Sequence, residues 1–291
     1  MVGTFNLGWA FDATDDRTEM ANENNAATPA DWEWKRNEIA KVLAREQLDV
    51  VALQGIGGER ELIDLVVQLR EASKLEYEYA FVDGEDRITG LQVALLSKYP
   101  LQEKRRLDIS LPRHVAADVK LPDDRTVTML VVHLRAGSYR AQIEARMKQA
   151  KSLKRAVDQL RKDQPVVVLG DVNGELAPEQ EGYKATAEGL LSGAATPSKL
   201  EDDCKDSAYY EAAQMTDWQG KATHRIFVCG LDLRSAAASS RNLIFRGDVD
   251  PEGSKWSKLP VDHEPFRDVS ENLLVRAQIV LPDNPTSAAG E

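Results

Sequence analysis

The sequence has no long apolar run and only two cysteines. Even its longest clean apolar runs, such as 165–169, are short, whereas a helix needs roughly 18 to 20 apolar residues to cross a bilayer. We therefore expect no membrane span. No basic segment followed by an apolar stretch opens the chain, so no signal peptide is expected within it. These absences predict a soluble protein, either cytoplasmic or secreted after removal of a signal.

The two cysteines, Cys204 and Cys229, lie far apart, without C-x-x-C spacing and without a flanking histidine pattern. Zinc-binding domains usually show such spacing, and small disulfide-stabilised domains contain many more cysteines. The sequence thus indicates neither a zinc site nor a disulfide framework, and two unrelated thiols are expected.

Positive charge is also scarce, because 37 Lys and Arg residues stand against 48 Asp and Glu residues, a formal net charge of −11. Proteins that bind nucleic acid usually present a basic field. The acidic balance therefore disfavours long-range attraction to a polyphosphate, although it is compatible with a locally basic groove.

What is present is the composition of a globular protein, with 42% hydrophobic residues and well-mixed charges. Apolar periodicity alternates between short strands and amphipathic helices, with no internal repeat or low-complexity linker. The pattern predicts one α/β domain over 1–281 and a polar tail over 282–291. Strands are predicted at 4–9, 49–53, 77–82, 90–97, 116–120, 126–133, 165–169, 224–228, 242–245 and 273–280, helices from residue 29, at 60–73 and at 139–162, and long loops at 12–29 and 174–222.

Polar residues stand at the ends of the predicted strands, where sites form in layered α/β proteins because several strand ends converge there. Each also has a structural interpretation. Asp171 and Asn173 are typical of a turn, and His133 of a hydrogen-bonded core histidine. Asp262 and His263 are equally typical of a surface pair. Their combination in chain order favours a common site, whose candidates are Asn6, His133, Asp171, Asn173, His224, Asp262 and His263.

In that order the residues resemble the motifs of the endonuclease/exonuclease/phosphatase superfamily, which includes pancreatic-type deoxyribonucleases, sphingomyelinases and inositol-polyphosphate 5-phosphatases. The resemblance runs from about residue 4 to residue 280, and its last two motifs are the most specific. It implies an α/β fold, a four-layer α/β sandwich in which two mixed β-sheets pack face to face with helices outside. The matching segments are Thr4–Leu7, Trp34–Arg36, Asp49–Gln54, Gly90–Leu101, Val132–Leu134, Leu169–Asn173 and Val261–Pro265.

The resemblance implies a divalent-metal-dependent phosphoesterase and a role for each residue. Asp171 would orient or deprotonate the attacking water, and Asn173 would hold both Asp171 and a phosphate oxygen. His263 would bond a non-bridging phosphate oxygen. His133 would act as a general acid or as a phosphate contact. Such chemistry needs positioning, charge neutralisation and a base near the water.

The implied metal ligands are Asn6 and Asp262, whose oxygens suit a hard cation such as Mg²⁺ or Mn²⁺. Two positions depart from the family pattern. The family's second strand ends in Leu-Gln-Glu, and that Glu is its main metal ligand, whereas this chain reads Leu53-Gln54-Gly55. The family also has an Asp that holds the closing histidine, and here His224 stands in its place. Both changes remove a carboxylate.

Two main interpretations follow from these departures. In the first, the protein is a phosphoesterase with an altered or weakened metal site. In the second, it is a catalytically inactive relative that serves as a phosphate- or protein-binding module. A clone-specific change at position 55 is a third alternative. Replacement ligands for the first interpretation are Glu59, Gln92 or Asp15-Asp16 for a hard cation, or His133, His224 and His263 for a transition metal.

The substrate is expected to be a phosphate ester, either nucleic acid or a small phosphodiester. Arg135 and Arg225 are close in sequence to site histidines and could clamp a phosphate through two parallel hydrogen bonds. Together with His224 they are the predicted phosphate contacts. The sequence indicates no protein partner.

Overall fold

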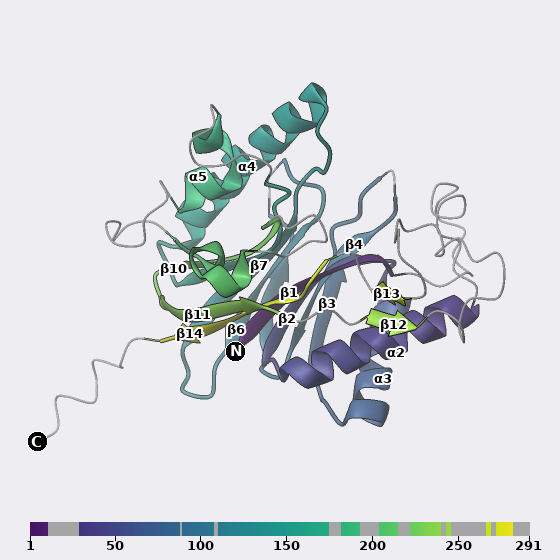
Figure 1. Ribbon diagram of the computed structural model, residues 1–291. Helices are drawn as coiled ribbons and strands as arrows, with labels where there is room; N and C mark the ends of the chain where they lie inside the picture. Colours follow the sequence, from purple (N-terminus) through teal and green to yellow (C-terminus); the bar gives the residue numbers. More distant parts are fainter. Residues whose placement is uncertain are drawn as a thin grey trace, which may run out of the picture.

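The computed structural model describes residues 1–10, 29–87, 89–107, 110–174, 182–192, 204–214, 222–239, 243–245, 266–268 and 272–281. Within them, two six-stranded mixed sheets pack face to face, with α-helices on their outer sides (Figure 1). The predicted four-layer α/β sandwich is thereby confirmed. No helix in these residues is long and apolar enough to cross a membrane. The predicted tail, 282–291, lies outside the described residues.

Sheet A has the strand order β11-β14-β1-β2-β4-β3. β1 pairs in parallel with β2 and antiparallel with β14. Every residue of β2 is buried, because one face packs on the other sheet and the other face lies under α2 and α3. The elements are β1 (Val2–Ala10), β2 (Val50–Ile56), β3 (Tyr79–Asp83), β4 (Gln92–Ser97), β11 (Asp232–Ala238), β14 (Val275–Val280), α2 (Pro29–Glu46) and α3 (Glu59–Ser73).

Sheet B has the strand order β5-β6-β7-β8-β10-β9, with α4 and α5 on its outer face (Figure 1). β7 and β8 pair in parallel, and α4 makes the connection between them. The elements are β5 (Leu101–Arg105), β6 (His114–Lys120), β7 (Thr126–His133), α4 (Arg140–Leu160), β8 (Val166–Asp171), α5 (Ala187–Leu191), β9 (Lys205–Asp206) and β10 (His224–Cys229). Three 3₁₀ turns, Tyr183–Ala185, Ser207–Tyr209 and Glu211–Ala213, and a separate pair, β12 (Leu243–Phe245) and β13 (Phe266–Asp268), complete the described chain.

The sandwich has three apolar cores, one between the sheets and one on the outer side of each sheet, and the side chains of a strand alternate between the inner core and one outer core. Successive residues of a strand point to opposite faces, so in β8 Val167 and Leu169 lie between the sheets while Val166 and Val168 pack beneath α4 and α5. Asp171 continues the first series. The side chains that face the space between the sheets are therefore polar at one end of the sandwich. The candidate site lies at this end.

The predicted helices and strands are present in the described residues, with ends displaced by a few residues. Four strands were not predicted: β5, β9, β11 and β13. β5 and β11 carry mostly exposed or half-buried side chains, so they lack an apolar pattern, while β9 and β13 are too short to show one. Most of the loop predicted at 12–29 lies outside the described residues.

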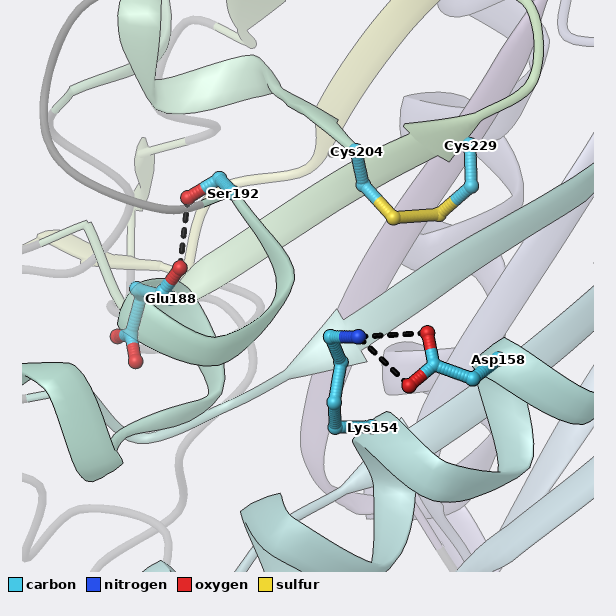
Figure 2. The surroundings of a disulfide bond; sticks show 6 residues. All are labelled: Lys154, Asp158, Glu188, Ser192, Cys204 and Cys229. Carbon is cyan, nitrogen blue, oxygen red and sulfur yellow. Dashed lines mark hydrogen bonds and ion pairs between the residues drawn. A yellow bond between two sulfur atoms is a disulfide. The ribbon is translucent and has the colours of Figure 1, made fainter. Parts of the chain in front are cut away.

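Cys204 and Cys229 form a disulfide (Figure 2), so the expectation of two unrelated thiols is wrong. β9 pairs antiparallel with the end of β10, with Lys205 opposite Val228, and this register brings the residue before β9 opposite Cys229. The backbone N–H of Cys204 also donates to the carbonyl of Leu191, at 2.9 Å, at the end of α5. A strand of two residues shows no periodicity, so the pairing left no mark in the sequence.

Candidate active site

Three of the predicted residues lie side by side on β7, β8 and β10. The antiparallel register of β8 and β10 sets Asp171 opposite His224, and the parallel register of β7 and β8 sets His133 beside Asp171. All three side chains are buried. They meet because each belongs to the inner-face series of its strand at the same end of the sheet.

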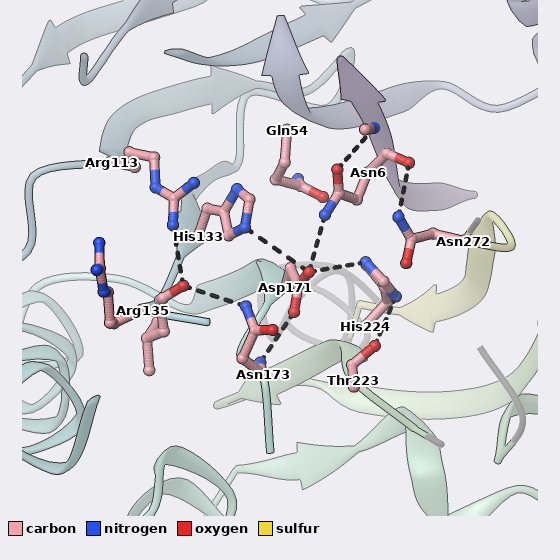
Figure 3. A network of polar contacts seen from close by, with 12 residues as sticks. Asn6, Gln54, Arg113, His133, Arg135, Asp171, Asn173, Thr223, His224 and Asn272 are labelled. Atoms are coloured by element: carbon pink, nitrogen blue, oxygen red, sulfur yellow. Dashed lines mark hydrogen bonds and ion pairs between the residues drawn. The ribbon is translucent and has the colours of Figure 1, made fainter. Parts of the chain in front are cut away.

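Asp171 is the centre of a polar network that joins the two sheets (Figure 3). Its Oδ2 accepts a hydrogen bond from Nδ2 of Asn6 at 2.8 Å and lies 3.1 Å from Nε2 of His224. Its Oδ1 accepts the backbone N–H of Asn173 at 2.9 Å. Nε2 of His133 lies 3.8 Å from Oδ2. Since Asn6 belongs to β1, the network fixes the carboxylate against both sheets.

Asn173 and Arg113 form a second part of the network, organised by one backbone carbonyl. Asn173 adopts a left-handed backbone conformation with φ of 48°, which turns the chain after β8. Its Nδ2 donates to the carbonyl of Leu134 at 3.1 Å, and Nη2 of Arg113 donates to the same oxygen at 3.1 Å. An amide and a guanidinium are thereby aligned beside Asp171.

The charges of the site favour an ionised aspartate and a neutral histidine. Burial by itself would raise the pKa of Asp171, but His224, His133 and the hydrogen bond from Asn6 outweigh it and hold that pKa below its usual range. Burial, reinforced by the nearby Arg113, lowers the pKa of His133 to about 3. A neutral imidazole still donates a hydrogen bond but carries no spare proton. Of the two roles implied for His133, the phosphate contact therefore fits better than the general acid.

The sequence matches the family model described as Endonuclease/Exonuclease/phosphatase family over residues 3–233. The chain belongs to this family. Its members are generally phosphoester hydrolases, which agrees with the polar network found here. No curated protein matches the sequence.

Solved structures of endonuclease/exonuclease/phosphatase proteins share the fold. The mannosyl-6-phosphatase Bt3783 of Bacteroides thetaiotaomicron superposes with a TM-score of 0.62 at 16% identity, over 96% of this chain and 99% of that one. The beta toxin of Staphylococcus aureus gives a TM-score of 0.61 at 14% identity, over 95% and 98%. A humanized D. rerio TDP2 gives 0.56 at 16% identity, over 96% and 98%. At such identities the likeness establishes the fold alone.

Divalent cations are typical cofactors of the family, but the described residues do not make up a hard-cation site. Oδ1 of Asn6 accepts the backbone N–H of Gly8 at 2.9 Å, and Gln54 is hydrogen-bonded to Thr4. Gly55, where the resemblance implies a glutamate, offers no side-chain ligand atom. Across the described residues, no group of three or more His, Cys, Asp or Glu side chains is arranged to hold a metal ion.

The backbone at position 55 leaves no room for a side chain. Gly55 has a φ of +78°, and a Cβ atom there would lie 2.1 Å from the carbonyl oxygen of Gly8. The pairing of β1 with β2 and of β2 with β4 is irregular at this point, which is typical of a β-bulge. The local backbone thus favours glycine, and this argues against a clone-specific change.

Several predicted residues are not brought into the network. Arg225 points to the opposite face of β10 from His224, where its Nη1 lies 2.5 Å from Oδ2 of Asp206. Arg225 is thus paired with Asp206 away from His224, and the phosphate contact expected of it stays a prediction. Arg135 lies half-buried near Arg113 (Figure 3). Of the remaining candidates, Asp262 and His263 fall outside the described residues.

The suggested replacement ligands do not join the network either. Glu59 is exposed in the first turn of α3, and Gln92 opens β4 half-buried, and neither contacts Asp171 in the described part of the chain. Residues 15 and 16 are outside the described ranges. The transition-metal alternative within the first interpretation also requires His263, which falls outside the described residues.

Sequence reasoning missed two residues that border Asp171. Arg113 immediately precedes β6, and its alternation with Val115 and Ala117 places it on the inner face. This spacing could have identified it. Thr223 lies beside His224, with its Oγ1 3.1 Å from Nδ1, and thereby fixes the ring. A threonine before a strand carries no comparable signal.

Proposed function

We propose that this chain hydrolyses a phosphate ester, with Asp171 as the group that orients and deprotonates the attacking water. The observation that carries the proposal is the Asp171 carboxylate, buried at one end of the sandwich and held from both sheets. A charged carboxylate in this position can accept a hydrogen bond from a water molecule and so orient it. Family membership supports the same type of reaction.

The reaction needs one bond to form and one to break at phosphorus. The water oxygen attacks phosphorus as Asp171 takes up its proton, the ester P–O bond breaks, the leaving oxygen takes a proton from solvent, and Asp171 then releases its proton to solvent. Neutral His133 can donate a hydrogen bond to a phosphate oxygen, and Arg113 supplies positive charge on the same side. Asn173, aligned by the Leu134 carbonyl, can hold a further phosphate oxygen.

A divalent cation, Mg²⁺ or Mn²⁺, would supply additional charge neutralisation in such a reaction. The described donors do not form its site, so every role above is assigned to the chain's own side chains. If a cation contributes, we expect Asp262 to bind it, by analogy with the family motif. Chelation of metal during the assay therefore tests the cofactor separately from the Asp171 role.

A second candidate function is phosphate binding without turnover. One observation favours it: both oxygens of Asp171 already interact with protein groups, Oδ1 with the backbone of Asn173 and Oδ2 with Asn6 and His224. A base with so many donors has little free lone-pair capacity for water. This candidate predicts that phosphate protects the protein against unfolding while no ester is cleaved.

The test is hydrolysis of p-nitrophenyl phosphate and bis-p-nitrophenyl phosphate by the wild type, Asp171→Asn and the control Asp124→Asn, whose Asp124 is exposed. A hexose 6-phosphate is added because one structural neighbour is a mannosyl-6-phosphatase. Each assay is run with a chelator and with Mg²⁺, Mn²⁺ or Zn²⁺. We expect Asp171→Asn to lose about 100-fold or more of the rate. Wild-type inactivity under all conditions, with phosphate still bound, would replace the hydrolase by the binding module.

A further inference from the structure

Helix α4 contains three polar side chains that point at the loop after β7 instead of at solvent. Gln142, Arg146 and Gln149 are spaced by four and three residues, so they lie on one face of the helix. Arg146 is buried, at 7% exposure, whereas a basic residue of a helix usually faces solvent. The finding is specific to Arg146, because Arg155 on the same helix is exposed.

These side chains hold the backbone of residues 135–139. Nη1 of Arg146 donates to the carbonyl of Arg135 at 2.8 Å and to that of Gly137 at 2.9 Å. Oε1 of Gln149 accepts the N–H of Arg135 at 2.8 Å. Oε1 of Gln142 accepts the N–H of Tyr139 at 3.1 Å. The loop thus has its conformation set by helix side chains, because it lacks a partner strand for these groups.

The loop follows Leu134, whose carbonyl accepts hydrogen bonds from the two side chains proposed to contact phosphate, Asn173 and Arg113. Leu134 donates its N–H to the carbonyl of Asp171 at 2.8 Å, and its own oxygen accepts from Asn173 and Arg113. The N–H of the same peptide group, that of Arg135, donates to Gln149, and the carbonyl of the next peptide group accepts from Arg146. The orientation of the Leu134 carbonyl is therefore fixed by β8 on one side and by α4 on the other.

We propose that Arg146 is a positioning residue for the reaction: through residues 134–137 it sets the carbonyl that aims Asn173 and Arg113 at the substrate phosphate. The inference rests on the proposed function for its catalytic consequence. Its structural part, the alignment of Asn173, is independent of turnover. A guanidinium suits the role because its planar fork can reach two carbonyls at once, which a lysine ammonium does less well.

The experiment compares Arg146→Met, Arg146→Lys and the milder Gln149→Met with the matched control Arg155→Met. The first readout is the NMR signal of the Asn173 side-chain amide, assigned with Asn173→Asp, together with hydrogen exchange of residues 135–139. The second is kcat and KM for bis-p-nitrophenyl phosphate, or for whichever ester the wild type cleaves. Rescue by guanidinium ion is measured on Arg146→Met.

We expect Arg146→Met to shift the Asn173 amide signal, to speed exchange of the loop, and to lower kcat about 30-fold with a smaller change in KM, because small misplacements of catalytic groups are costly. Arg146→Lys and guanidinium should restore part of the loss. Unchanged Asn173 signals in folded Arg146→Met and Gln149→Met would overturn the inference, and so would the same shift in Arg155→Met. If no variant or wild type turns over, the proposed function fails while the NMR result still decides the positioning role.

Discussion

His224 Nε2 lies 3.1 Å from Asp171 Oδ2, directly across the β8–β10 pair. The resemblance to the family implies an aspartate at this position, and a second carboxylate there would repel Asp171. The imidazole instead offers a donor, and it is the largest of the influences that lower the pKa of Asp171. The substitution therefore changes the electrostatics of the centre from two competing acids to one acid with a histidine partner.

Replacing His224 should raise the pKa of Asp171. In His224→Ala the carboxylate loses this partner while its burial remains, so the acid limb of the pH–rate profile should move to higher pH. Unfolding free energy should fall by about 2 to 4 kcal/mol, because a buried ring is lost and a buried polar group loses a donor. His224→Gln, which keeps an amide donor, serves as the control. An acid limb at the same pH in all three proteins would contradict this account.

Much of the fold was predictable because its strands are buried on both faces and its helices are amphipathic. The apolar runs at β2 and β8 and the periodicity of α4 left clear signals in the sequence. Strands at the sheet margins, such as β5 and β9, could not be predicted because their side chains are exposed or too few. These strands form because they pair with a neighbouring strand of the folded sheet, which their own residues do not indicate.

The candidate site was predictable where a polar residue ends a buried strand, as with His133, Asp171 and His224. Arg225 does not point the same way as His224, although the two are adjacent in sequence, because adjacent residues of a strand face opposite sides. Arg146 escaped notice because a basic residue within a helix usually faces solvent. Its role depends on a loop whose conformation the sequence does not display.

Arg225 is expected to support the fold and not to bind phosphate. It faces the buried carboxylate of Asp206 at 2.5 Å, and Glu188 at 3.8 Å. Arg225→Met should lower the unfolding free energy by about 3 kcal/mol, because removing one partner leaves buried charge uncompensated. Chemical denaturation measures this effect, and calorimetric titration with inorganic phosphate measures binding. Weaker phosphate binding by folded Arg225→Met, with no loss of stability, would reverse the assignment.

Restoring the family glutamate at position 55 should destabilise the protein before it creates a metal site. A Cβ at Gly55 would lie 2.1 Å from the carbonyl oxygen of Gly8, and the backbone φ of +78° already disfavours a side chain. We expect Gly55→Glu and Gly55→Ala to cost about 2 to 4 kcal/mol.

The matched control for position 55 is Gly230→Ala. Gly230 has the same φ of +78°, but a Cβ there would lie 3.7 Å from Cα of Pro165, an ordinary van der Waals contact. The difference between Gly55→Ala and Gly230→Ala in melting temperature isolates the clash from the backbone strain. Equal losses would show that Gly8 moves away at little cost.

The disulfide between Cys204 and Cys229 should contribute measurably to stability. It closes a loop across a sequence separation of 25, for which the chain-entropy model gives about 3.5 kcal/mol. Reduction, or the double change Cys204→Ala with Cys229→Ala, should lower the unfolding free energy by a comparable amount. Thiol titration of the unfolded, unreduced protein should find no free thiol. Two reactive thiols and no effect of reductant would refute the pairing.

Acid should destabilise the protein through His133. Its pKa is about 3 in the folded state and ordinarily 6.5, so the unfolded chain binds a proton that the folded protein excludes between these values. Stability should therefore decline as pH falls below about 6.5, with a slope of up to about 1.4 kcal/mol per pH unit from this residue. Asp171, whose pKa is lowered, adds its own loss only at lower pH, as it becomes protonated.

His133→Gln should flatten that decline, since glutamine does not titrate. Denaturant unfolding between about pH 4 and pH 7 measures the slope for both proteins. Burial also lowers the pKa of His114, which contributes to the same window, so His114→Gln shows how much of the wild-type slope belongs elsewhere. If His133→Gln keeps the full wild-type slope while His114→Gln loses it, then His133 is protonated in the folded protein, and its proposed role as a neutral hydrogen-bond donor to phosphate is replaced by that of a cation.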